Sequence, residues 1–204
     1  MFQDAFTKFD EKESKTVLAE INPALTGEGF DSASVTVLGQ AIAFYPGYRF
    51  LDIADYEMTP HMRKFVVYKP GDVTVLDWTN RPVYALNDKV PLALNDETVA
   101  DYMRFFFDYV RGPHGKFSVV ENVDDIPWRD EPPPAARKAL GKLLFPVSPQ
   151  GRNEDGSYRL GACMVFGDIL YKTAVFITAN GRVTIADQEI MVDDMPVLDD
   201  VFGQ

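Results

Sequence analysis

The sequence predicts an α+β fold, in which an antiparallel, strongly twisted or partly closed sheet of about six to nine strands packs with about three helices. Two pairs of β-rich segments are joined by turn residues, at Pro70-Gly71 and at Asn180-Gly181. Strands and helices do not alternate regularly, which argues against a parallel sheet. We expect residues 1–204 to form a single domain, with an N-terminal helical segment over 1–26 and the loop at 150–157 as a candidate internal boundary.

Spacing and a capping pattern predict the N-terminal helical segment. Its first turns are indicated by four apolar residues at helical spacing, Phe2, Ala5, Phe6 and Phe9. Asp10 followed by Glu13 matches a capping box, and Pro23 should end the helix that begins there. The buried stripe of that helix would be formed by Val17, Leu18 and Ile21.

Residues 34–78 have the composition and period of β-strands. The segment 34–45 is rich in β-branched and aromatic residues, and 48–58 alternates, with Leu51, Ile53 and Asp55 on one face. The segment 64–78 reads as a hairpin around Pro70 and Gly71, because a type II turn needs the positive φ that glycine accepts.

An aromatic helix is expected over about 96–111, with Asn95 as its N-cap and Gly112-Pro113 at its end. Its charged side should be a solvated stripe of Asp101, Arg104, Asp108 and Arg111, while Phe105 and Phe107 widen the apolar face. Together with a later strand this face should supply the core, namely Val99, Met103, Phe106, Val110, Val175 and Ile177.

The remaining chain adds a strand at 115–123, a proline-initiated helix within 129–146, a loop at 148–158 and a hairpin at 173–187. The hairpin contains Asn180-Gly181, the pair preferred in a type I′ turn. The buried stripe of the helix would be Ala136, Ala139, Leu140 and Leu143. Its outer face carries the local basic cluster of an acidic chain, Arg137, Lys138 and Lys142.

Charge and cysteine content limit which classes of partner and which cellular compartment we expect for this protein. The chain has 20 Lys plus Arg against 31 Asp plus Glu, a net charge of −11 that disfavours nucleic acid as a partner. The single cysteine, Cys163, lies in an apolar segment and reads as a core residue. There is no secretory signal pattern and no run of about 18 apolar residues, so we expect a cytoplasmic protein that does not bind a membrane.

Motifs for common chemistry are absent from the sequence. It has no glycine-rich nucleotide-binding pattern, no H-E-x-x-H and no G-x-S-x-G, so we expect no cofactor and no metal site. The acidic doublets are expected to protect strand edges rather than hold a cation, and they are Asp124-Asp125, Asp193-Asp194 and Asp199-Asp200. His61 and His114 read as loop residues, and the sequence leaves open whether either lines a pocket.

Three classes of function follow. The sequence favours a non-enzymatic binding or interaction protein, whose partner is an unknown protein or small molecule, or a homo-oligomer joined through sheet edges or aromatic patches. A small-molecule-binding domain with an apolar pocket is the alternative. An enzyme dependent on carboxylates and histidine is the third and least favoured. The basic face of Arg137, Lys138 and Lys142 has three candidate roles: docking an acidic C-terminal segment, holding an anionic ligand, or serving as an ordinary solvated face.

Overall fold

The computed structural model describes residues 6–198, which separate into two compact units. Residues 6–77 and 81–93 form the N-terminal unit, and residues 78–80 and 94–198 form the C-terminal unit. The single-domain expectation stays a prediction, because compact units of one chain can still unfold as one cooperative body. The candidate boundary at 150–157 lies inside a β-hairpin of the C-terminal unit.

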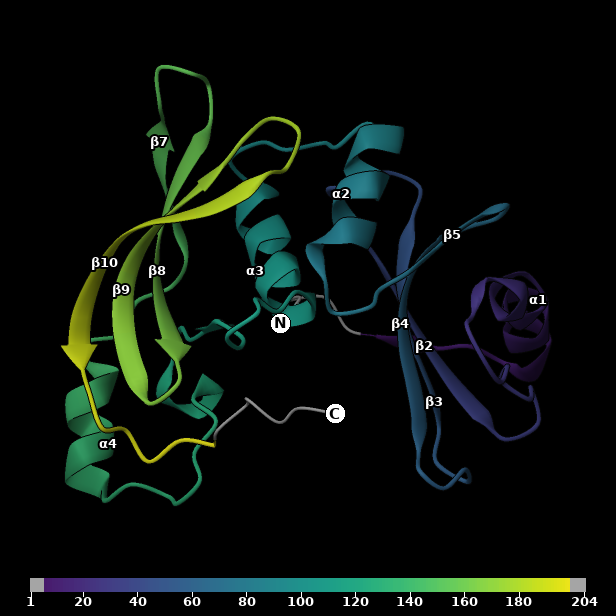
Figure 1. The fold of residues 1–204 in the computed structure, drawn as a ribbon, viewed down its shortest axis with the longest axis horizontal. Helices are drawn as coiled ribbons and strands as arrows, with labels where there is room; N and C mark the ends of the chain where they lie inside the picture. Colours follow the sequence, from purple (N-terminus) through teal and green to yellow (C-terminus); the bar gives the residue numbers. More distant parts are fainter. Residues whose placement is uncertain (1–5, 199–204) are drawn as a thin grey trace. The chain divides into compact units, whose positions relative to one another are not determined.

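The N-terminal unit contains a five-stranded antiparallel sheet in the order β1-β2-β3-β4-β5. The strands are β1 (Thr7–Lys8), β2 (Val35–Ala41), β3 (Arg49–Asp55), β4 (Met62–Lys69) and β5 (Asp72–Val75). Its helices are α1 (Glu11–Ile21), the short 3-10 helix η1 (Asn22–Ala24) and α2 (Asn80–Lys89), and Figure 1 shows α1 lying beside the sheet. Gly71 has φ 79° in the predicted β4–β5 turn, which confirms that hairpin.

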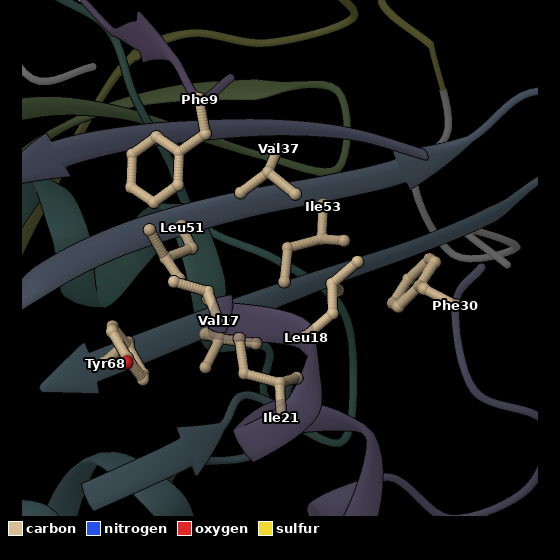
Figure 2. Close-up of a cluster of buried hydrophobic side chains, with 10 residues drawn as sticks. Phe9, Val17, Leu18, Ile21, Phe30, Val37, Leu51, Ile53 and Tyr68 are labelled. Carbon is tan, nitrogen blue, oxygen red and sulfur yellow. The ribbon is translucent and has the colours of Figure 1, made fainter. Parts of the chain in front are cut away.

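Helix α1 begins where its capping box predicts. The Asp10 carboxylate accepts a hydrogen bond from the Glu13 amide, and the Glu13 carboxylate accepts one from the Asp10 amide. The predicted stripe is buried on the sheet, where α1 contributes Val17, Leu18 and Ile21 and the strands contribute Val37, Leu51, Ile53 and Val66 (Figure 2). Each such aliphatic side chain contributes roughly 1.5–3 kcal/mol when fully buried.

In this unit one predicted element is wrong and one helix was missed. Residues 7–8 form a strand rather than a helical turn, because Thr7 and Lys8 pair with Gly39 and Leu38 of β2. Of the four residues behind that prediction, Phe2 and Ala5 lie outside the described residues. Helix α2 was not predicted, although its sequence has proline in the first turn, buried Val83 and Leu86 three apart, and lysine in the last turn.

The C-terminal unit contains a second antiparallel sheet, ordered β10-β9-β8-β6, with β7 also paired to β8. Its strands are β6 (Ser118–Val119), β7 (Ser148–Arg152), β8 (Tyr158–Phe166), β9 (Ile169–Ile177) and β10 (Val183–Val192). Its helices are α3 (Val99–Tyr109), the short 3-10 helix η2 (Val123–Asp125) and α4 (Pro134–Gly141). One of its core clusters comprises Val120, Ile126, Cys163, Val165, Leu170, Met195 and Val197.

Helix α3 is the aromatic helix that the sequence predicts. All six predicted core residues are buried, as are Phe105 and Phe107. The helix starts later than expected, and Asn95 instead caps the preceding turn, accepting hydrogen bonds from the Glu97 and Thr98 amides. The predicted solvated stripe is wrong at Arg104, which is buried in an ion pair with Glu121.

Three local predictions for this unit also fail. Asn180-Gly181 lies in the β9–β10 hairpin as expected, but only Gly181 has a positive φ, so the turn is not type I′. Part of the predicted loop at 148–158 is strand β7, whose five residues are all exposed. The predicted stripe of α4 is mostly exposed, and only Leu140 of its four residues packs against the core cluster.

The predicted class, α+β with antiparallel sheets, is confirmed. The described strands form two five-stranded sheets rather than one larger sheet, and the described residues contain four α-helices where about three were predicted. Periodicity identifies strands one at a time, and it does not say which strands pair.

Candidate functional site

The candidate site is a groove of about 570 Å³ in the N-terminal unit, between the first half of α1 and one end of the sheet. This volume is typical of sites for small organic ligands. We call it the α1 groove, and it is lined by Phe9, Asp10, Lys12, Glu13, Thr16, Val17, Gly47, Arg49, Tyr68 and Pro70. Phe9 and Tyr68 lie at one end of the buried cluster and Phe30 lies at the other (Figure 2).

The apolar floor of the groove depends on a glycine in the middle of β2. A Cβ atom on Gly39 would come within 2.3 Å of the Phe9 ring and 3.1 Å of Leu51. The missing side chain therefore lets the Phe9 ring lie close against the sheet, where it is only 7% exposed. Val17 of α1 and Tyr68 of β4 complete the buried floor.

Arg49 is the notable charged group of the groove. It opens β3, opposite Ala41 of β2 and Tyr68 of β4, and its guanidinium carbon lies 5.5 Å from the centroid of the Phe9 ring. Such a cation–π contact favours a defined position for the cation. Within residues 6–198 no carboxylate lies within 4.0 Å of this guanidinium, and its N–H groups donate no hydrogen bond to a described residue.

One flank of the groove is fixed by Glu20 of α1. Its carboxylate accepts hydrogen bonds from the Tyr68 hydroxyl at 3.2 Å and from the Gly71 amide at 2.7 Å. Burial raises the pKa of Tyr68, and the negative charge of Glu20 and the hydrogen bond to it raise the pKa further. Tyr68 therefore remains a neutral phenol that donates to Glu20, and this contact ties α1 to the β4–β5 turn.

The acidic groups at the rim already have partners. The carboxylates of Asp10 and Glu13 form the capping box. That of Asp10 accepts a hydrogen bond from the Glu13 amide at 2.7 Å, and that of Glu13 accepts one from the Asp10 amide at 3.1 Å. The Thr16 hydroxyl donates to the Lys12 carbonyl at 2.9 Å, so it is bonded within its own helix. Of the two hydroxyl groups that line the groove, that of Thr16 has no side-chain base as its partner, and that of Tyr68 donates to Glu20 with a raised pKa.

A polar network elsewhere in the unit has a structural role. The Tyr48 hydroxyl donates to Asp72 at 2.6 Å, and the Lys89 ammonium forms an ion pair with the same carboxylate. Burial, followed by the hydrogen bond to Asp72 and its charge, raises the pKa of Tyr48 to about 12. Burial acts to raise the pKa of Asp72, but the hydrogen bonds from Lys89 and Tyr48 outweigh it and lower that pKa. Near neutral pH neither Tyr48 nor Asp72 is placed to exchange a proton.

Two further hollows are less suited to an organic ligand. One of about 510 Å³, beyond the other side of α1, is shallow and is lined by Lys15, Leu18, Ala19, Asn22, Gly29, Phe30, Asp31 and Ser32. The other, also about 510 Å³, lies in the C-terminal unit beside Arg129, Asp168 and Asp194. Its surface is mainly polar, and the Arg129 guanidinium already contacts Asp130 at 3.3 Å.

The basic residues predicted from the sequence lie on α4 and at its C-terminal end, and none of them is among the residues that line the α1 groove. Arg137 is occupied by ion pairs to Asp124 and Glu131. Lys138 and Lys142 are exposed, and neither forms an ion pair with a described residue. A binding role for Arg137, Lys138 and Lys142 stays a prediction.

The other residues singled out from the sequence are dispersed. His61 is exposed with its ring 5.8 Å from that of Tyr56, and His114 is exposed in the turn that follows α3. Cys163 is fully buried in β8, and burial raises the pKa of its thiol. Within residues 6–198 no cluster of three or more His, Cys, Asp or Glu side chains could hold a metal ion. The last doublet, Asp199-Asp200, lies outside the described residues.

Sequence reasoning missed the α1 groove, since its floor combines residues far apart in the chain. One signal was present in Gly39, because an isolated glycine within a strand pattern indicates close approach by another group. Comparison with known protein families, curated proteins and solved structures finds no match to this chain. None of the helices in the described part of the chain has the length and hydropathy needed to cross a bilayer.

Proposed function

We propose that this is a non-enzymatic binding protein, and that its α1 groove holds a small organic ligand. The observation that carries the proposal is the composition of the groove, which joins a buried apolar floor to a rim with an arginine that has no carboxylate partner within residues 6–198. Binding sites for small molecules typically combine apolar walls with a few polar groups that fix orientation. Binding is favoured over catalysis because the Thr16 hydroxyl is bonded within its own helix and the pKa of the Tyr68 phenol, which donates to Glu20, is raised.

The test is to follow the amide resonances of ¹⁵N-labelled protein during titration with 1-naphthol, a neutral aromatic probe. We expect shifts concentrated at Phe9, Thr16, Arg49 and Tyr68. Thr16→Trp should suppress them, because the indole would fill the groove from the exposed side of α1. Lys15→Trp is the matched control, since Lys15 is the adjacent exposed residue and lines the hollow on the other side. Shifts that persist in Thr16→Trp would refute the proposal.

Self-association through β10 is a second candidate function. This ten-residue strand lies at one end of the strand order among the described residues, and its Ile190 side chain is 60% exposed. Such an edge offers unpaired backbone groups to a second chain. Light scattering coupled to gel filtration should report a dimer that Ile190→Lys returns to a monomer. A monomeric wild-type protein would exclude self-association through β10.

We also infer a cytoplasmic location, which the single buried cysteine supports.

A further inference from the structure

We infer that the ligand of the α1 groove is a small organic monocarboxylate with an apolar body, anchored by the guanidinium of Arg49. This inference rests on the proposed function of the groove and names the class of its ligand. Arg49 is exposed at the groove, and no described carboxylate takes up its charge. A guanidinium presents its N–H groups in a planar fork that matches the two oxygens of a carboxylate.

The position of Arg49 favours a contact in which the guanidinium holds the carboxylate of the ligand in one defined geometry. The Phe9 ring beneath the guanidinium restricts its motion, so less side-chain entropy is lost when an anion binds. The same ring forms the apolar floor, and a ligand whose carboxylate meets Arg49 can therefore lay its hydrocarbon or aromatic part on Phe9 and Val17.

The rest of the rim favours a single negative charge on the ligand. Asp10 and Glu13 line the same groove, and both carboxylates stay close to the end of α1 because they cap it. They would repel a second anionic group on the ligand, as would the net charge of −11 at longer range. A phosphate ester or dicarboxylate fits this rim less well than a monocarboxylate. The Tyr68 hydroxyl donates to Glu20, which leaves Lys12 and Arg49 as the cations of the groove, and Arg49 is the one held over the Phe9 ring.

The test compares two probes of nearly equal shape, 1-naphthaleneacetate and the neutral 1-naphthaleneacetamide, by the same amide titration at pH 7. We expect the carboxylate to bind at least about tenfold more tightly, as a charge-assisted hydrogen bond allows. Arg49→Gln should reduce this ratio to about one, because a glutamine amide cannot form the charge-assisted pair with the carboxylate. Lys15→Gln removes the same charge from α1 outside the groove and should preserve most of the ratio.

Each outcome separates this inference from the proposed function. If both probes bind the groove equally well, the carboxylate anchor is refuted and the groove still binds small molecules. If Arg49→Gln keeps the ratio, Arg49 is not the anchor. If neither probe nor 1-naphthol binds, the proposed function fails first. Raising the salt concentration should lower the ratio of the two probe affinities in the wild-type protein. This measurement tests the role of charge if Arg49→Gln does not fold.

Discussion

Arg104 of α3 donates two hydrogen bonds to the carboxylate of Glu121, each 2.8 Å long, and a third of the same length to Asp101. The Arg104 side chain is only 9% exposed, and that of Glu121 is 25% exposed. Glu121 also accepts the Val147 amide, just before β7. The pair therefore links α3 to two segments that follow it in the C-terminal unit.

Arg104→Gln should lower the free energy of unfolding by about 3 kcal/mol at pH 7, since removing one partner leaves a partly buried charge uncompensated. Denaturant unfolding would measure this loss. Arg159→Gln is the control, because Arg159 and Asp187 lie 3.7 Å apart in an exposed pair that should contribute less than about 1 kcal/mol. Equal losses for the two variants would mean that the Arg104 pair contributes no more than a surface contact.

The difference between wild-type and Arg104→Gln should also depend on pH. Burial acts to raise the pKa of Glu121, but the hydrogen bonds from Arg104 and the Val147 amide outweigh it and hold the pKa below its ordinary value of 4.5. The folded pKa is lower than the unfolded one, so the stabilisation is fully present above pH 4.5 and is lost as the pH falls through the folded pKa. The difference should thus shrink below pH 4.5, and a difference that grows there would contradict this assignment.

Phe106→Ala should lower the free energy of unfolding by about 3–5 kcal/mol, which is the usual cost of removing a core phenylalanine. Phe106 is 6% exposed on α3, with its ring centroid 5.5 Å from that of Phe107. His114→Ala is the control in the turn that follows, and because His114 is exposed its replacement should change stability by less than about 0.5 kcal/mol. Thermal and denaturant unfolding of both variants would check this, and a loss below about 1 kcal/mol for Phe106→Ala would contradict its core position.

Elements specified by local patterns could be predicted from the sequence. The capping box of Asp10 and Glu13 involves two residues three apart, so its geometry follows from the helix alone. The aromatic face of α3 is likewise periodic over eleven residues, and each of its predicted core positions is buried. The β4–β5 turn at Pro70-Gly71 depends on the conformational preferences of two adjacent residues.

Features that depend on tertiary partners could not be predicted in the same way. Arg104 lies on the charged side of α3, and it is buried in an ion pair with Glu121, 17 residues later, which the local pattern does not reveal. Strand β7 has all its side chains exposed and exists through backbone pairing to β8, so it has no hydrophobic pattern to detect. The α1 groove joins Phe9, Arg49 and Tyr68 through tertiary contacts, since β3–β4 pairing sets Arg49 opposite Tyr68 and the Phe9 amide donates to the Val37 carbonyl of β2.

Gly39→Ala should test whether the floor of the groove depends on this glycine. The added Cβ would lie 2.3 and 2.7 Å from two carbons of the Phe9 ring, so the ring must move away from β2. We expect a loss of about 1–3 kcal/mol from overpacking, slightly offset by the smaller entropy of the unfolded chain. The displaced ring would also lose its place beneath Arg49, and binding of 1-naphthol should weaken together with stability.

A double-mutant cycle identifies the cause of that loss. In the background of Phe9→Ala, the methyl group of Gly39→Ala meets an empty space instead of the ring, with Leu51 as its remaining close neighbour at 3.1 Å. The cost of Gly39→Ala should therefore be smaller there than in the wild-type protein, giving an interaction energy of at least about 0.5 kcal/mol. Additive losses would show instead that the Phe9 ring does not rest against Gly39, and the floor of the α1 groove would then need another explanation.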